Sequence, residues 1–335
     1  MQRRDFLSFT ALISGGMVLS ACSTSNAAVP AVNASQPKPK GAVTYYTEIR
    51  VSDPQKAAVV GKIDELIATM SKKKGYLSIS FKQMTGESTM VKNYPNNLKG
   101  VLDRGFMNNN KVPNFYSLFV RFDSYDNMVA SGVQTWFKNN IVPSLFAYKM
   151  ENGKPVKTSI ALDYYEGVFV TAAAGDRNHI YIKQADIVNF LRNQADEVHG
   201  KGLSNRPLVT VENHVMIKNR DLAVFGKKAV KLLETAQETF MPLDGGTTGI
   251  GTPGTMDADN DNYRKAVTTE ILQNAFADGD LRAYILHGTW ESVADHENSH
   301  IDHRFQEALA PVGGYVVVGP VEPFYDTIKQ HNNNA

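Results

Sequence analysis

Hydrophobic residues recur along the chain with two different periods, and these periods predict two series of short elements. Residues 42–51 alternate between hydrophobic and polar side chains as a strand does, and residues 54–74 repeat their hydrophobic side chains at helical spacing. The first series continues with strands at 76–84, 115–122 and 161–170 and a helix at 124–146. The second has strands at 208–218, 265–276, 281–290 and 315–318, with helices at 221–241 and 291–310. Each series predicts the order βαββαβ.

A constant shift of 168 residues relates the second series to the first. Phe122, which ends one predicted strand, corresponds to Trp290 under this shift (290 minus 122 is 168). The same shift carries Asp53, at the start of one predicted helix, to Asp221 at the start of another. Because a chance similarity would not hold one offset over separated segments, we interpret the chain as a tandem duplication of one unit.

The two units define the predicted domain organisation. We place the first half at 42–175, a connecting segment with its own helix at 176–206, and the second half at 207–330. The order βαββαβ is that of the ferredoxin-like α+β fold, in which four antiparallel strands carry two helices on one face. Because each sheet leaves its other face uncovered, we expect the two halves of this single chain to form a body like a dimeric α+β barrel.

The first residues predict export rather than a folded element. Arg3 and Arg4 open the run RRDFL, which resembles the twin-arginine export motif, and a short apolar run follows. The sequence LSAC, which ends at Cys22, resembles the lipobox at which bacterial lipoproteins are cleaved and acylated. We therefore expect a signal peptide at 1–21 and a lipidated, flexible tether at 22–41. These features predict a protein anchored by lipid on the periplasmic side of a bacterial membrane.

Composition and charge argue against several classes of function. Cys22 is the only cysteine, so an intrachain disulfide and an all-cysteine zinc site are excluded. The 35 basic and 34 acidic residues nearly balance, which argues against binding to nucleic acid or to an anionic membrane surface. We expect the lipid anchor to be the only contact with a membrane, and the sequence leaves a homodimer open.

The end of one predicted strand and the helix that follows it resemble a known family. Trp290 ends the strand, and His296 to Ser299 give the motif H-x-x-S within the run WESVADHENSHIDHRF. This combination resembles the antibiotic biosynthesis monooxygenase-like family, which includes cofactor-independent oxidases of aromatic phenols, quinol oxidases and haem-degrading enzymes. The resemblance implies O2-dependent oxidation of a small aromatic or quinol, with a protein base that forms the phenolate.

The same resemblance leaves a second hypothesis open. Because the family also has members without known activity, the chain could be a non-catalytic lipoprotein that binds a ligand or haem. The sequence does not decide whether the protein is an enzyme. It assigns no cofactor either, and leaves haem and a metal ion as alternatives.

Polar residues on two equivalent strands give the candidate catalytic pair. In the strand 208–218, Glu212 and His214 share the face opposite the aliphatic residues. A carboxylate beside a partly buried imidazole is a plausible proton-transfer pair, because the carboxylate stabilises the imidazolium. The equivalent strand of the first half puts Tyr46 and Glu48 on its polar face, and we predict that they bind the ligand. The alternative is a buried, hydrogen-bonded pair without chemistry.

Two further candidates lie on the strand 281–290. His287 and Trp290 point to opposite faces of that strand, so at most one of them can line the same cavity. We expect Trp290 to form an apolar wall of a pocket in the second half, either between its sheet and helices or between the two sheets. Long insertions at 85–114 and 242–264 could cover such a pocket.

The histidines of the helix 291–310 offer a candidate metal site. His296 and His300 are four residues apart, a spacing that lets two imidazoles of one helix chelate a metal ion. If 291–310 is one continuous helix, these histidines and His303 lie away from its apolar stripe. We therefore expect a solvated polar face here, with a metal or haem ligand as the alternative.

Overall fold

The computed structural model describes residues 36–87, 114–159, 165–193, 208–238, 251–252, 255, 263–300 and 302–333. The predicted signal peptide with Cys22 lies outside these residues, as does most of each long insertion. Among the described helices, none is both long and apolar enough to cross a bilayer.

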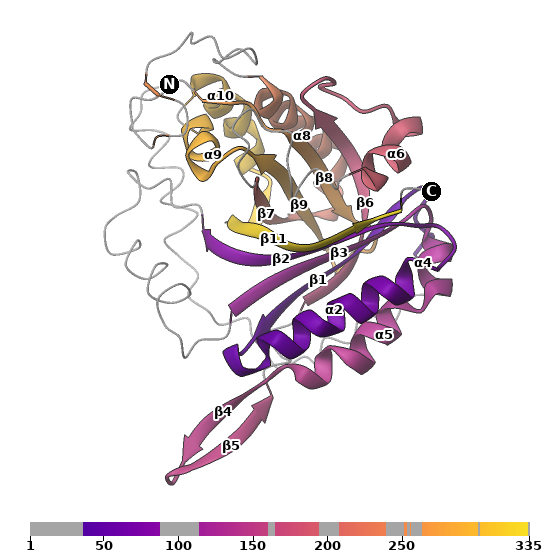
Figure 1. Cartoon of the computed structure of the whole chain (residues 1–335). Coiled ribbons are helices and arrows are strands. Elements are labelled where there is room, and N and C mark those ends of the chain that lie inside the picture. Colours follow the sequence, from indigo (N-terminus) through magenta and orange to yellow (C-terminus); the bar gives the residue numbers. More distant parts are fainter. Residues whose placement is uncertain are drawn as a thin grey trace.

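The first half contains the predicted elements and one unpredicted hairpin. Its strands are β1 (Val43–Val51), β2 (Tyr76–Glu87), β3 (Asn114–Phe122) and β6 (Tyr165–Asp176). Its helical segments are η1 (Asp53–Gln55), α2 (Lys56–Met70), α4 (Tyr125–Ser131), α5 (Val133–Asn140) and η3 (Val142–Ser144). The hairpin, β4 (Phe146–Glu151) with β5 (Lys154–Ser159), projects away from the body of the molecule (Figure 1).

The second half repeats this order and adds a long final strand. Its strands are β7 (Val209–Lys218), β8 (Thr268–Asn274), β9 (Leu281–Trp290), β10 (Val316–Val321) and β11 (Pro323–Asn332). Its helical segments are η6 (Asn219–Asp221), α8 (Leu222–Gln237), α9 (Val293–Ser299) and α10 (His303–Gly313). Before it come η5 (Gln184–Asp186) and α6 (Ile187–Arg192), where the connecting helix was predicted.

Apart from β4 and β5, the described strands form one closed, antiparallel sheet. Their order is β10-β7-β11-β2-β3-β1-β6-β8-β9, and an additional β7–β9 pairing closes the ring. Within each half the order is ferredoxin-like, and the halves join at two seams, β2 with β11 and β6 with β8. The predicted α+β fold of two ferredoxin-like βαββαβ halves in a barrel-like body is therefore confirmed.

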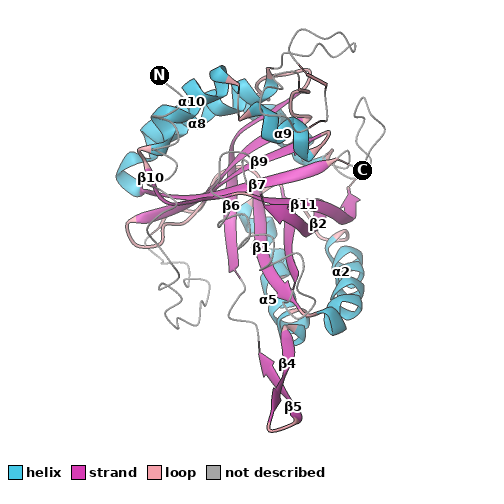
Figure 2. Cartoon of the chain, turned by 90° about the vertical axis from the view of Figure 1, so that its left-hand side faces the viewer, coloured by secondary structure: helices cyan, strands magenta, loops and turns pink. Residues whose placement is uncertain are grey.

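Helices cover the outside of this barrel, as Figure 2 shows. The main core of the first half packs α2, α4 and α5 against the outward residues of its strands, among them Val43, Tyr45 and Ile49 of β1. In the second half, Ile217 of β7 packs in the same way beneath α8 and α10. The alternate residues of each strand consequently point into the barrel.

Each half breaks its second long helix at one place. The predicted helix 124–146 is divided at Gly132, whose φ of 73° is left-handed and therefore favours glycine. The predicted helix 291–310 is divided between α9 and α10. The N-cap of the first segment is a serine in both halves, and the Ser124 and Ser292 side chains each accept a hydrogen bond from the backbone N–H three residues on.

Candidate functional site

A hydrogen-bonded cluster around Glu212 lies inside the barrel. The Glu212 side chain is fully buried, and its two oxygens accept bonds from different strands: Ser117 Oγ donates to Oε1 over 2.7 Å, and Tyr46 Oη donates to Oε2 over 3.0 Å. Lys82 Nζ lies 3.8 Å from Oε1 and supplies the opposite charge. Glu212 is therefore held in place from three strands of the first half.

His214 is the partly exposed member of the same cluster. Its Nε2 lies 3.5 Å from Tyr46 Oη and 3.9 Å from Glu212 Oε2. The His214 side chain is 24% exposed, whereas that of Glu212 is 0% exposed. The predicted pair and Tyr46 thus form a chain of polar groups that runs from the barrel interior towards solvent.

Burial determines the protonation of this cluster. Burial raises the pKa of Glu212, while Lys82 and His214 oppose that change by stabilising its charge. Burial and the charge of Glu212 together hold the pKa of Tyr46 well above its usual value. The Tyr46 hydroxyl therefore stays protonated and acts as the donor to Glu212.

Two further predicted residues also lie at the barrel interior but bind different partners. His287 Nε2 is 2.9 Å from Lys82 Nζ and, since an ammonium only donates, this nitrogen accepts. Burial, together with the charges of Lys82 and Arg121, lowers the pKa of His287 well below its usual value, so the imidazole is neutral. Glu48 accepts a 2.7 Å bond from Tyr325 Oη of β11.

Sequence reasoning missed a second buried ion pair in the barrel. Arg121 Nη1 lies 2.9 Å from Glu270 Oε2, and Thr171 Oγ1 donates to Glu270 Oε1 over 2.7 Å. Arg121 and Glu270 were not singled out because alternation alone does not tell a charged residue inside a barrel from one in solvent. The signal that could have found them is their place on the same strand faces as Phe119 and Leu272, which lie in the interior.

Trp290 lies on the other side of the sheet from His287. It packs outside the barrel with Val211, Tyr263 and Phe324, and its ring meets that of His296 at 5.2 Å in an edge-to-face arrangement. Trp290 therefore does not share a cluster with Glu212 and His214, and the prediction that it forms an apolar wall of their pocket is wrong, because its side chain leaves β9 on the outer face of the barrel.

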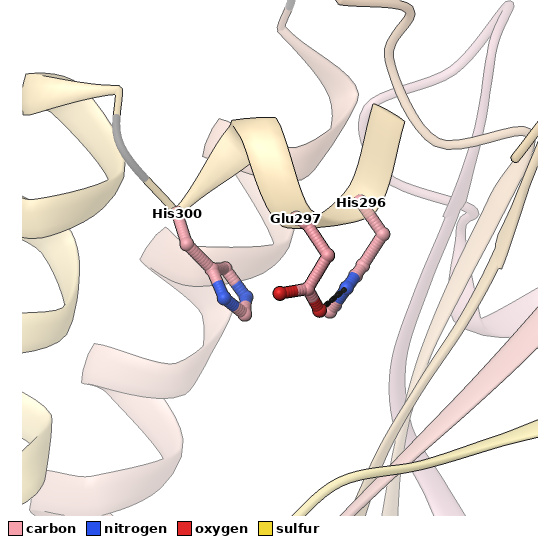
Figure 3. A group of neighbouring side chains, drawn as sticks. All are labelled: His296, Glu297 and His300. Atoms are coloured by element: carbon pink, nitrogen blue, oxygen red, sulfur yellow. Dashed lines mark ion pairs between the residues drawn. The ribbon is translucent and has the colours of Figure 1, made fainter. Parts of the chain in front are cut away.

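The His296 and His300 side chains are buried, which corrects the expected solvated face. They are 5% and 7% exposed, whereas the His303 side chain, 71% exposed, does lie in solvent. The prediction of a solvated face was wrong because it assumed one continuous helix at 291–310. The break between α9 and α10 changes the direction of the second segment. Figure 3 shows Glu297 of α9 with its carboxylate between the imidazoles of His296 and His300.

These three side chains can bring metal-binding atoms together. One ligand atom each from His296, Glu297 and His300 lies within 4.8 Å of the other two. A further carboxylate, which the sequence did not indicate, approaches from the β10–β11 connection: Glu322 Oε1 is 3.5 Å from His296 Nε2 and 3.9 Å from His300 Nε2. Glu322 was missed because the predicted strand ended four residues earlier.

The charges of this cluster oppose the effect of burial. Burial lowers the pKa of His296, but the charge of Glu322 and the contact with Glu297 outweigh it and raise that pKa to about 9. Burial lowers the pKa of His300. Burial would raise the pKa of Glu322, yet His300 and His296 hold it below its usual value. A carboxylate and an imidazolium therefore face each other in a poorly solvated space.

A surface groove lies apart from both clusters. It has a volume of about 480 Å³ and runs between α8 and α10. Its described lining residues are Lys227, Lys228, Lys231, Thr235, Glu238, Arg304, Glu307, Ala308 and Pro311. None of the predicted site residues is among them.

Comparison with solved structures gives similar folds at low sequence identity. An anthrone oxidase-like protein has 10% identity and a TM-score of 0.51, and the match covers 89% of this chain and 95% of that one. A candidate monooxygenase from Fusobacterium nucleatum subsp. nucleatum has 8% identity and a TM-score of 0.49, covering 87% and 94%. One from Lactobacillus acidophilus has 7% identity and a TM-score of 0.48, covering 88% and 97%. The first of these supports the fold.

Sequence comparison identifies the two halves separately. A search of curated protein sequences gave no significant match. Residues 172–328, which include most of the second half, match the CT0912-like, C-terminal domain. Residues 42–127, which run from β1 into α4, match the ABM-like domain. The chain therefore carries an ABM-like domain at 42–127, followed by a CT0912-like C-terminal domain at 172–328.

Proposed function

We propose that the protein oxidises a small aromatic or quinol with O2, and that His214 is the base that takes the proton from the substrate hydroxyl. The monooxygenase-like fold supports the reaction class. The observation that carries the assignment is that His214 is the partly exposed end of a buried polar chain, 3.5 Å from Tyr46 and 3.9 Å from Glu212. A substrate hydroxyl that reaches His214 from solvent therefore meets a base that Tyr46 and Glu212 position from the barrel interior.

Each member of the chain has a separate task in this proposal. His214 accepts the proton and becomes an imidazolium, and the Glu212 carboxylate stabilises that cation. Tyr46, held neutral, keeps one oxygen of Glu212 in position, while Ser117 holds the other. The deprotonated substrate is richer in electrons and gives them up to O2 more easily. For a quinol, two electrons and two protons pass to one O2, so that one quinone and one hydrogen peroxide form.

The first test is whether the purified protein consumes oxygen. Phenols and quinols are supplied one at a time, and oxygen uptake, quinone absorbance and peroxide are followed together. The proposal predicts uptake with at least one compound and, for a quinol, equal amounts of quinone and peroxide. Tight binding of a phenol or of haem without oxygen uptake would contradict it, and would support the non-catalytic ligand- or haem-binding lipoprotein instead.

We also propose that the chain is exported by the twin-arginine route and anchored through Cys22 on the periplasmic side of a bacterial membrane. The support is the order of RRDFL, an apolar run and LSAC near the start of the sequence. In this setting, a membrane-soluble quinol is a natural substrate class, because the anchor holds the barrel near the lipid surface.

A further inference from the structure

We propose that His296, His300 and Glu322 form a binding site for one divalent first-row transition-metal ion. This inference does not rest on the proposed function, because the three residues lie outside the barrel, at α9 and the β10–β11 connection, and not with Glu212 and His214. It assigns Glu322, from the β10–β11 connection, as the third ligand in place of Glu297.

The distances from Glu322 to the two histidines suit a shared ion. Glu322 Oε1 lies 3.5 Å from His296 Nε2 and 3.9 Å from His300 Nε2. Two atoms that are each about 2.0–2.1 Å from a tetrahedral ion lie roughly 3.4 Å apart, so Glu322 lies close to the required separation from each histidine. His296 lies in α9 and His300 is the C-cap residue of the same helix, about one turn later.

One neighbouring group already holds a ligand, and a second lies beside another ligand. Asn213 Nδ2 donates to Glu322 Oε1 over 2.9 Å and so fixes the carboxylate. Glu297 Oε1 lies 3.4 Å from His296 Nδ1, the ring nitrogen that faces away from Glu322. A carboxylate on the second nitrogen of a metal-binding histidine is a common support, because it orients the ring and raises its basicity.

The same geometry excludes Glu297 as a ligand together with Glu322. Glu297 and Glu322 approach opposite nitrogens of His296, and one ion cannot bind both nitrogens of one ring. Glu322 also approaches the Nε2 atom of His300, so the site on its side brings together both histidines and a fixed carboxylate. We therefore place the ion on the Nε2 side.

Apolar rings surround the site and limit its solvent. Trp290 and Phe324 meet the His296 ring edge-to-face at 5.2 and 5.3 Å, and Phe305 stacks on His300 at 4.8 Å. A buried His300 Nδ1 has no hydrogen-bond partner among the described residues. A cation that all three ligands share would stabilise a charged cluster in such poorly solvated surroundings.

The donor set selects the class of metal. Two imidazoles and one carboxylate suit Zn2+ or Fe2+, whereas Mg2+ and Ca2+ prefer oxygen ligands throughout. Three protein ligands leave a coordination position for water or substrate, as in catalytic rather than structural zinc sites. The same set of two histidines and one carboxylate is that of Fe2+ sites that activate oxygen. The structure assigns a ligand set that suits both Zn2+ and Fe2+, and metal analysis distinguishes the two ions.

The test is a metal titration of the full protein after removal of metal with a chelator. Zn2+ and, without oxygen, Fe2+ are titrated by calorimetry, and Co2+ is titrated by its visible absorption. We expect one ion per chain, and a thermal unfolding midpoint that rises on loading because the ion binds the folded state. Protein purified without the chelator is analysed for zinc and iron, which identifies the resident ion. A wild-type protein that binds no ion under these conditions overturns the proposal.

Variants separate the ligand from its neighbour. Glu322→Gln should weaken binding at least 100-fold, and Glu297→Gln by about 10–100-fold, as outer-shell changes do. His303→Ala is the matched control, because this exposed histidine of the next helix should leave binding unchanged. Equal binding by Glu322→Gln and the wild type overturns the assignment. Loss of metal binding in Glu297→Gln but not in Glu322→Gln also overturns this assignment.

A second measurement uses only the wild-type protein, so it tests the proposal even if a variant fails to fold. Anomalous scattering from a crystal of the metal-loaded wild type should give one peak within bonding distance of the two Nε2 atoms and the Glu322 carboxylate. A peak beside His296 Nδ1 and Glu297 contradicts the proposed ligand set. Because neither readout involves oxygen uptake, failure of this site and failure of the proposed function are distinguishable.

Discussion

Tyr46 and His214 lie 168 residues apart in the sequence and 3.5 Å apart in the barrel. The separation is the offset of the internal repeat, so the two residues occupy equivalent positions of β1 and β7. Each half thus contributes the same strand position to one polar cluster, but with a different side chain. The duplication supplies the symmetry, and in the proposed function the phenol donates a hydrogen bond while the imidazole takes the proton of the substrate.

The hydroxyl of Tyr46 should stabilise the fold as well as the cluster. Tyr46→Phe leaves Glu212 with Ser117 and Lys82 but removes one buried hydrogen bond, and we expect a loss of about 1–3 kcal/mol in the free energy of unfolding. Urea unfolding measures it. Tyr148→Phe, an exposed tyrosine of the β4–β5 hairpin, is the control and should change stability by less than about 0.5 kcal/mol. Equal effects of the two variants would contradict the assigned role.

The charge of Lys82 should be essential while Glu212 is charged. Lys82→Met leaves a fully buried carboxylate without its cation, which we expect to cost about 3–5 kcal/mol of stability. Adding Glu212→Gln should recover part of this loss because the uncompensated charge disappears. The exposed pair Lys62–Glu65 is the comparison, and Lys62→Met should cost less than about 1 kcal/mol. Additive effects of Lys82→Met and Glu212→Gln in a double-mutant cycle would show that the two charges do not interact.

The neutral state of His287 predicts a pH dependence of stability. The pKa of His287 is well below its unfolded value of about 6.5, so under acid conditions only the unfolded chain takes up this proton. Its contribution to stability is therefore present above about pH 6.5 and is lost as pH falls, by at most about 1.4 kcal/mol per pH unit.

This contribution is measured as a difference between two proteins. His287→Gln keeps an acceptor for Lys82 and removes the titration. Urea unfolding at pH 7.5, 6.5 and 5.5 should show that wild type loses more stability towards acid than the variant does. Parallel curves for the two proteins would mean that His287 does not carry the effect.

The export proposal predicts a covalent change at Cys22. Cys22→Ala should leave the chain uncleaved or free of the membrane, because acylation needs the thiol. Membrane fractionation and mass spectrometry of the mature N-terminus check this. Arg3→Lys with Arg4→Lys should separately impair export. Unchanged processing and membrane association of Cys22→Ala would refute the lipid anchor.

The strand pattern predicted the fold because both faces of each strand are specified. On β7, Val211 and Ile217 face the helices while Glu212 and His214 face the barrel, as their alternation indicated. The hairpin β4–β5 was not predicted, since its mostly exposed side chains give no hydrophobic period. Strand β11 was missed likewise, because its mixed polar residues become a strand only through pairing with β2 of the other half.

The candidate site residues were likewise predictable from the sequence only in part. Local alternation placed Glu212 and His214 on one face, and their contact with Tyr46 follows from the closure of two repeated halves. The burial of His296 and His300 depends on a helix break and on a carboxylate 22 residues further along the chain (322 minus 300 is 22). Neither has a periodic signal, so only the folded chain reveals that cluster.

The rate of oxygen uptake in His214→Ala, relative to the wild type, tests the proposed function most directly. The best substrate of the screen is used at saturation, with His179→Ala, another histidine with an exposed side chain, as the matched control. Loss of the general base should lower the rate by about 10²–10⁴-fold, while the control keeps the wild-type rate. A full wild-type rate in folded His214→Ala would contradict the assignment of His214 as the base.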